Sequence, residues 1–227
     1  MVLSLLLPAR CPGCGVAGPS PCPGCVAGLR PAPPGAVPAG LDACWSLFAY
    51  DGVGRRFVTG LKYRRDRAGV AWLAAAMAVL ASPPPGTVVT WAPTSAARRR
   101  QRTFDQSEVL ARAIARRWDA PCLPLVARKA GPPQTGRSLA DRRAGPILLA
   151  RAGSRAAAGR PVVVVDDVVT TGSTLSAAAR ALRTVDAAWV AGLTAARTPR
   201  RATPPPSVLL LPPKVGEIPK VGGSTGR

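Results

Sequence analysis

The sequence predicts an α/β fold with a parallel β-sheet, preceded by a small cysteine-rich segment and followed by an aperiodic tail. The strongest sign is Val162–Val165, an uninterrupted valine run of the kind found in strands that are buried on both faces of a parallel sheet. Apolar β-branched runs alternate with segments of helical spacing around it, as is typical of parallel α/β sheets. Composition divides the chain into a cysteine-rich segment over 1–43, an α/β domain over 44–197 and an expected disordered tail over 198–227.

The spacing of apolar residues predicts the elements of the α/β domain in chain order. Apolar and β-branched runs predict strands, which lie over 45–50, 87–91, 123–127, 161–165 and 188–194. Apolar residues recurring every three to four positions predict helices over 53–63, 70–80, 105–118 and 174–185, the third capped by Asp105 or Ser107. The segment 129–138 is rich in glycine and proline and is expected to be a mobile loop.

Charge and composition exclude some chemistry and leave other partners open. The chain has 31 Lys and Arg, 11 Asp and Glu, a net charge of +20 and no histidine. Ser-His-Asp triads, Cys-His pairs and mixed Cys/His zinc sites are therefore excluded. The positive charge favours phosphate-rich partners. Aromatic residues are sparse at 4%, so a nucleic-acid partner and a solvated basic surface both stay open.

No segment of the sequence predicts export or membrane insertion. The apolar run over 1–7 ends at Pro8 and lacks both a basic segment before it and a small-residue cleavage site after it. There is no apolar stretch of the roughly 18 residues that a membrane-spanning helix needs. We therefore expect a cytoplasmic protein with reduced thiols and no membrane partner.

Four cysteines near the N-terminus have the spacing of a structural zinc site. Cys11 and Cys14 form one Cys-Pro-Gly-Cys pair, and Cys22 and Cys25 form a second pair seven residues later. Two such pairs supply the sulfurs of a closed tetrahedral Zn²⁺ site, whose binding free energy would stabilise a segment that has no core. A disulfide pair or a redox motif is the alternative, although a thioredoxin-like motif would be a single pair after a strand. The remaining Cys44 and Cys122 are expected to be ordinary buried residues.

The valine strand leads into the most informative stretch of the chain. Asp166 and Asp167 follow the strand, and a loop of small residues then enters a helix: Thr170, Thr171, Gly172, Ser173 and Thr174. Small residues let backbone N–H groups approach a phosphate, and the helix N-terminus adds partial positive charge. The two carboxylates are placed to accept hydrogen bonds from the vicinal hydroxyls of a ribose. An ordinary capped strand-loop-helix connection is the alternative, and a Walker A loop is excluded because Gly-x-x-x-x-Gly-Lys is absent.

This stretch resembles the signature motif of type I phosphoribosyltransferases. Together with the cysteine pairs, it makes the chain resemble the ComF family of competence-associated proteins, which join an N-terminal zinc knuckle to a phosphoribosyltransferase domain. The likeness runs from Cys11 to Thr198, and its further pieces, in family order, are Tyr50–Gly52, Leu61–Tyr63, Arg102–Gln106, Pro133–Gly136 and Asp141–Arg143. The resemblance implies the type I phosphoribosyltransferase fold, with residues 44–80 as a hood over the acceptor.

The same resemblance implies a site for phosphoribosyl pyrophosphate with Mg²⁺. In it, the catalytic pair Asp166 and Asp167 would hold the ribose hydroxyls, and the loop over 170–174 would hold the 5′-phosphate. The loop over 93–102 would hold pyrophosphate, with Arg98, Arg99 and Arg102 as its ligands because guanidinium groups match phosphate oxygens. A flexible loop over 128–142 would close over the reacting centre and offer Arg128, Lys129 and Gln134.

Two functions follow from the resemblance. One is transfer of the phosphoribosyl group to an acceptor that the sequence does not identify, in a protein linked to DNA uptake. The alternative is a non-catalytic accessory protein that binds single-stranded DNA or a DNA-uptake protein through its basic surface and zinc knuckle. A second copy of the chain is a further expected partner. The chain departs from the family in having Thr103 and Asp105 where the family has Gly and Asn, and Gly145 where it has Asn; Asp105 adds a negative charge close to the expected anion site.

Overall fold

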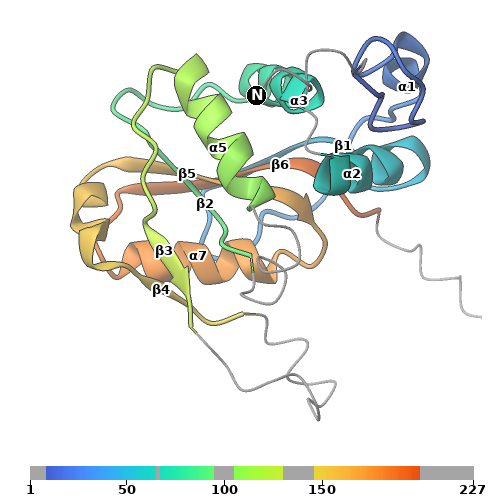
Figure 1. Cartoon of the computed structure of the whole chain (residues 1–227). Coiled ribbons are helices and arrows are strands. Elements are labelled where there is room, and N and C mark those ends of the chain that lie inside the picture. Colours follow the sequence, from blue (N-terminus) through green and yellow to red (C-terminus); the bar gives the residue numbers. More distant parts are fainter. Residues whose placement is uncertain (1–8, 65–66, 95–104, 130–145, 200–227) are drawn as a thin grey trace, which may run out of the picture.

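A computed structural model of the chain describes residues 9–64, 67–94, 105–129 and 146–199. Its helices and strands alternate along most of the chain (Figure 1). They are α1 (Pro23–Ala27), β1 (Ala43–Ala49), α2 (Gly52–Arg64), α3 (Arg67–Leu80), β2 (Val88–Trp91), α5 (Gln106–Arg117), β3 (Val126–Arg128), β4 (Leu148–Ala150), β5 (Pro161–Val169), α7 (Ser173–Arg183) and β6 (Trp189–Arg197), with a 3₁₀ helix over Ala152–Ala157 between β4 and β5. No helix in this part of the chain is long and apolar enough to cross a bilayer.

The main sheet has four strands in the order β1-β6-β5-β2, and every neighbouring pair is parallel. The carboxyl ends of the strands therefore meet at one edge, where Ala49, Arg197 and Val169 lie side by side in register. β2 ends at Trp91, which pairs with Val165, whereas β5 continues to Val169. Open parallel sheets bind their ligands at this edge.

Helices cover both faces of the sheet, with α2, α3 and α5 on one face and α7 on the other (Figure 1). The valine run of β5 alternates between the two layers: Val163 and Val165 belong to the core under α3 and α5, and Val162 and Val164 to the core under α7. All of them are fully buried, as predicted for a strand covered on both faces. The predicted parallel α/β fold is thus confirmed.

Several element boundaries differ from the sequence-based expectation. The strand expected over 123–127 is only β3, which pairs antiparallel with β4, an element the sequence did not predict. Before β3 the chain pairs with the edge of β2 through one parallel bridge, between Val89 and Cys122, and Leu125 then donates its backbone N–H to the Thr90 hydroxyl (3.2 Å) rather than continuing the pairing. A strand as short as β4 shows no measurable periodicity, which is why the sequence pattern missed it. β5 and β6 run further than expected, to Val169 and Arg197.

The cysteine-rich segment contains the short helix α1, where the sequence predicted no periodic element. α1 has five residues with Pro23 in its first turn, a position that proline favours because its missing N–H would have no partner there. Five residues are too few to show helical spacing, so composition alone could not reveal the helix.

Residues 31–42, here called the strap, connect the cysteine-rich segment to β1 along the face of the sheet that α7 covers. Near its start, Pro31 forms a bridge with Phe48 of β1. Pro38 lies against Gly172 and Gly40 lies against Ala179 of α7. At its end, the Asp42 carboxylate accepts the Val190 N–H (2.7 Å) at the amino end of β6. The strap therefore crosses the sheet from its carboxyl edge to its amino edge.

Candidate functional site

The predicted phosphate loop lies at the carboxyl edge of the sheet, between the end of β5 and the start of α7. Thr170 and Thr171 are exposed, and Gly172 follows with a φ of 80°, in the left-handed region that glycine adopts without strain. The Thr171 hydroxyl accepts the Ser173 N–H (3.3 Å) and lies 3.1 Å from the Ser173 hydroxyl. The loop thus presents hydroxyl groups beside the amino end of an 11-residue helix, an arrangement suited to an anion.

The predicted acidic pair occupies the last part of β5, just before this loop. Asp166 and Asp167 are both partly buried. Oδ1 of Asp166 accepts the Asp167 N–H (2.8 Å) and the hydroxyl of Ser107 in the first turn of α5 (3.1 Å). The acidic pair and the phosphate loop are therefore brought to the same edge of the sheet, and the Asp166 carboxylate is held by donors from two elements. The sequence analysis did not assign a role to Ser107 at this site.

Asp105 caps α5 and also holds the start of the predicted pyrophosphate loop. Its side chain is 4% exposed, its Oδ1 accepts the Ser107 N–H (3.2 Å), and its Oδ2 accepts the Thr94 N–H (2.9 Å). The Asp105 carboxylate, expected to add negative charge near the anion site, thus accepts hydrogen bonds from two backbone N–H groups. It lies at a helix N-terminus, where a carboxylate is stabilised. Asp105 is one of the two caps that the sequence predicted for this helix, and the structure confirms it over Ser107.

The structure places only part of the predicted basic set. Arg98, Arg99, Arg102 and Gln134 lie outside the described residues. Arg128, at the end of β3, is partly buried and donates from Nε to the Pro93 carbonyl (3.4 Å), which brings the first residue of the predicted flexible loop to the start of the predicted pyrophosphate loop. Lys129 is exposed, and its backbone N–H bonds to the Ile147 carbonyl (3.0 Å).

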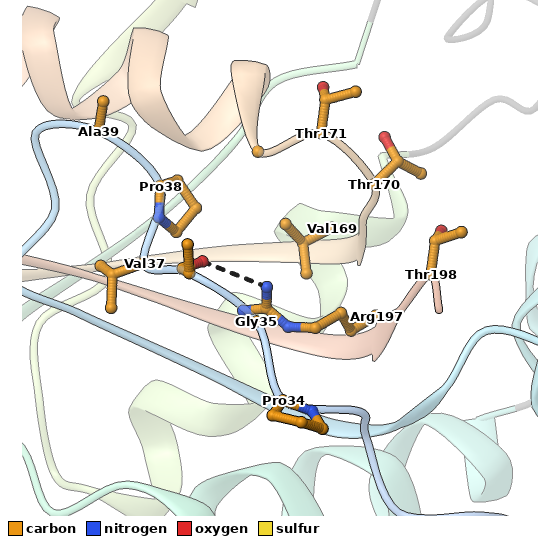
Figure 2. A pocket seen from close by; sticks show the side chains of 12 residues that line it. Pro34, Gly35, Val37, Pro38, Ala39, Val169, Thr170, Thr171, Arg197 and Thr198 are labelled. Atoms are coloured by element: carbon orange, nitrogen blue, oxygen red, sulfur yellow. Dashed lines mark hydrogen bonds between the residues drawn. The ribbon is translucent and has the colours of Figure 1, made fainter. Parts of the chain in front are cut away.

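A cavity of about 220 Å³ lies between the strap, the phosphate loop and the carboxyl end of β6 (Figure 2). The strap forms one wall, residues 169–172 form the opposite wall, and Arg197 and Thr198 lie between them. The sequence analysis did not single out Arg197, because nothing in the local pattern shows that a distant proline-rich segment returns to cover it.

The four N-terminal cysteines form one compact cluster, as the two Cys-x-x-Cys pairs predicted. The sulfurs of Cys11, Cys14, Cys22 and Cys25 all lie within 4.8 Å of one another, and those of Cys14 and Cys22 are 3.7 Å apart. A tetrahedral Zn²⁺ with Zn–S bonds of about 2.3 Å places its sulfurs about 3.8 Å apart. The six cysteines are free thiols, and 3.7 Å is far beyond the S–S bond of about 2.05 Å. The sulfur positions therefore fit a tetrahedral metal ion better than a disulfide.

The surroundings of the cluster shift the pKa values of Cys11 and Cys25 in opposite directions. Burial raises the pKa of Cys11, but backbone N–H groups of Cys22, Cys14 and Gly13 more than offset this and lower it to about 6. Burial, followed by hydrogen bonds with the other three thiols, raises the pKa of Cys25 to about 12. Charge repulsion among neighbouring thiolates is what a divalent cation relieves, so the donor set suits Zn²⁺.

The cysteine cluster docks on α2. A Cβ at Gly60 of α2 would lie 2.0 Å from the Pro12 carbonyl oxygen, so only glycine permits this close approach. Val53 of α2 contacts the other side of the segment, near Gly13 and Gly28. Outside the cluster, Cys44 and Cys122 are partly buried rather than fully buried as expected, and burial raises the pKa of both thiols.

One protein-family model matches part of the chain. Residues 105–208 match the family model of the phosphoribosyl transferase domain, a match that begins at the cap of α5 and includes both the acidic pair and the phosphate loop. Among solved structures, the chain is similar to one titled the structure of the allosteric regulatory enzyme of purine biosynthesis, with 22% sequence identity and a TM-score of 0.38. That alignment covers 56% of this chain and 26% of the other, so this chain spans about a quarter of that protein's length. No curated protein matches the chain.

Proposed function

We propose that this protein binds phosphoribosyl pyrophosphate as its Mg²⁺ complex and transfers the phosphoribosyl group to an acceptor. The observation that carries the proposal is the shared position of the Asp166–Asp167 pair and the loop over 170–174 at the carboxyl edge of the sheet, within the segment that matches the phosphoribosyl transferase family model. A ribose diol and a 5′-phosphate lie a few bonds apart, and the two features face them with acceptors and donors respectively.

Each part of the site would recognise one part of the ligand. The loop over 170–174 would bind the 5′-phosphate through backbone N–H groups and hydroxyls, and the acidic pair would accept hydrogen bonds from the ribose hydroxyls. Carboxylate oxygens are also ligands that Mg²⁺ prefers, so the donor chemistry fits this cation, which when bound neutralises charge on a pyrophosphate. Arg98, Arg99 and Arg102 are the proposed pyrophosphate ligands. Arg128, Lys129 and Gln134 are the proposed flexible-loop ligands, and the bond from Arg128 to Pro93 supports the first of these.

The proposed transfer breaks the bond between the anomeric carbon and the pyrophosphate oxygen, which leaves with the bonding electrons. A lone pair of the acceptor forms the new bond to the same carbon, and the acceptor loses its proton to water. Positive charge develops on the sugar ring during this exchange. The carboxylates of Asp166 and Asp167 would stabilise that charge from fixed positions, because Asp166 is already held by Ser107 and by the Asp167 backbone.

Calorimetry with phosphoribosyl pyrophosphate and Mg²⁺ tests the proposal. The variant Asp166→Asn with Asp167→Asn should lose binding by at least about tenfold, since two acceptors of the ribose hydroxyls become neutral amides. A matched control is Asp119→Asn with Asp186→Asn, which removes the same charge at two positions of positive φ (49° and 60°) that asparagine tolerates. The proposal fails if wild type does not bind, or if both double variants bind as wild type does.

We further propose that Cys11, Cys14, Cys22 and Cys25 hold a structural Zn²⁺ ion. The compact sulfur cluster and its docking on α2 support this assignment. A zinc knuckle joined to a phosphoribosyl transferase domain is the arrangement of the ComF family, and we propose this chain as a member of that family with a role linked to DNA uptake. Zinc quantification on the purified chain, with one ion expected for each chain, tests the first step.

The alternative function is a non-catalytic accessory protein that binds single-stranded DNA, which the net charge of +20 supports. Binding through phosphates must weaken steeply as salt rises. A titration of single-stranded DNA at several salt concentrations therefore separates the two functions. The double variant of the acidic pair should bind DNA as tightly as wild type or slightly more tightly, while it loses affinity for phosphoribosyl pyrophosphate. A DNA affinity that does not change with salt concentration excludes the alternative.

A further inference from the structure

Arg197 is fixed directly beside the phosphate loop. It is the last residue of β6 and pairs in register with Val169, the residue immediately before the loop. The next residue, Thr198, donates its backbone N–H to the Val169 carbonyl (3.0 Å), which continues the pairing past the end of the strand. The backbone position of Arg197 relative to the loop is therefore set by the sheet itself.

The guanidinium of Arg197 has few partners for a partly buried cation. Nη1 donates to the Ala36 carbonyl over a long 3.4 Å, and Nη2 donates to the Cys44 sulfur (3.4 Å), which is a weak acceptor. Among the described residues it has no carboxylate partner, whereas other arginines do: Arg30 pairs with Asp51, Arg112 with Glu108 and Arg183 with Asp42. A guanidinium carries five N–H donors, so most of its capacity is unused.

The strap holds this guanidinium against the cavity beside the loop. In Figure 2 the Arg197 side chain extends from the end of β6 to the strap, beneath Thr170 and Thr171. A Cβ at Gly35 would lie 2.6 Å from Nη1, and a Cβ at Gly172 would lie 2.8 Å from Pro38, so the strap packs closely against the guanidinium at Gly35 and against the loop at Pro38. Among the residues that the structure describes, none that lines the cavity is acidic.

A second polar group in the cavity lacks a partner. The Thr198 hydroxyl oxygen is buried and has no hydrogen bond within the described chain. Buried hydroxyls without partners are uncommon in native structures. A guanidinium with spare donors, a hydroxyl without a partner among the described residues and the amino end of α7 therefore line one cavity of about 220 Å³, and their shared chemistry is recognition of a small anion.

We propose that Arg197 is a ligand of the terminal phosphate of the sugar phosphate that the loop over 170–174 binds. This inference rests on the proposed function and adds to it a guanidinium contact from the strand after α7, together with a wall contributed by the strap. The Ala36 carbonyl positions one arm of the guanidinium, and the other N–H groups supply a paired contact to phosphate oxygens.

The test measures two ligands by calorimetry on the full chain. Arg197→Gln should weaken the binding of ribose 5-phosphate by about tenfold or more, since a charge-assisted hydrogen bond is lost. It should leave the affinity for Mg²⁺-pyrophosphate unchanged. Arg160→Gln is the matched control: Arg160 is also partly buried and donates to one carbonyl, that of Gly86 (3.0 Å), but lies next to the amino end of β5 at the opposite edge. It should change neither affinity.

The possible outcomes separate the inference from the function beneath it. If wild type binds neither phosphoribosyl pyrophosphate nor ribose 5-phosphate, the proposed function itself is wrong. Only the role of Arg197 is overturned if wild type binds ribose 5-phosphate and Arg197→Gln binds it equally well. The same holds if Arg197→Gln loses affinity for ribose 5-phosphate and for Mg²⁺-pyrophosphate to the same degree. Should Arg197→Gln melt well below wild type, Arg197→Lys replaces it: the charge is kept, the paired contact is lost, and affinity for ribose 5-phosphate should fall by about threefold.

Discussion

The hydroxyl of Ser107 donates a 3.1 Å hydrogen bond to Oδ1 of Asp166, so the first turn of α5 is tied to the end of β5. Ser107 is 5% exposed and Asp166 is partly buried, so the bond is partly shielded from water. Its backbone N–H bonds to Asp105, whose other oxygen holds Thr94. A short path of hydrogen bonds therefore joins the start of the predicted pyrophosphate loop to Asp166, which is predicted to bind the ribose hydroxyls.

We predict that Ser107→Ala weakens binding of Mg²⁺-phosphoribosyl pyrophosphate about fivefold, or about 1 kcal/mol, without unfolding the chain. The reason is that Asp166 loses one of the donors that orient its carboxylate. Calorimetry measures the affinity, and Ser107→Thr should recover most of it because the hydroxyl is kept. Equal affinity of Ser107→Ala and wild type would show that this bond does not position the carboxylate.

Asp105 is predicted to matter for stability, with an amide substitute tolerated better than alanine. Asp105→Ala removes the cap of α5 and leaves the Thr94 N–H without its acceptor, so the free energy of unfolding should fall by about 2–3 kcal/mol. Asp105→Asn keeps one acceptor oxygen and should lose about half as much. Urea denaturation gives both values.

The control for Asp105 is Glu108→Gln in the same helix turn. In the described part of the chain, Glu108 forms a salt bridge with Arg112 on the helix surface (2.9 Å), and such pairs contribute little, so this variant should stay within about 0.5 kcal/mol of wild type. A Glu108 variant as unstable as Asp105→Ala would contradict the capping role.

Gly60→Ala should destabilise the protein, against the usual trend for helices. Alanine in place of glycine inside an exposed helix normally stabilises it by about 1 kcal/mol. Here the new Cβ would meet the Pro12 carbonyl oxygen at 2.0 Å and push the cysteine-rich segment off α2, so we expect a loss of about 1–3 kcal/mol. Thermal denaturation measures it. Gly153→Ala, which meets nothing within 4 Å, should be neutral, and a stabilised Gly60 variant would show that the segment does not dock there.

Loss of one cluster cysteine should remove zinc. Cys25→Ser leaves three sulfurs around a site that needs four ligands, so metal content should fall from about one ion for each chain to near zero, with a lower melting temperature. Cys122→Ser is the control: Cys122 lies outside the cluster, so this variant should keep its zinc. Elemental analysis after gel filtration distinguishes them. Equal zinc in both variants, or none in wild type, would refute the assignment.

Much of the fold and part of the site could be predicted from local sequence pattern. The valines of β5 identify a strand buried on two faces, since burial on each face requires an apolar residue at every position. The cysteine cluster and the positions of the acidic pair and phosphate loop followed from spacing, because residues a few positions apart in a turn or loop must lie close together. The domain boundaries at 43 and 198 and the roles of the basic residues stay predictions.

The contacts that complete the site could not be predicted in this way, because they join residues that are distant in the chain. Ser107 and Asp166 are 59 positions apart, and Arg197 and Ala36 are 161 apart. Local sequence pattern depends only on residues that are close along the chain. It therefore identified the strand, the loop and the cysteine cluster, but not the residues that pack against them. Only packing of the strap and α5 around the parallel sheet determines which serine bonds to the Asp166 carboxylate and which arginine lines the cavity beside the loop. The physical reason is that side-chain pairing across a sheet edge depends on strand order, and strand order is a property of the assembled core.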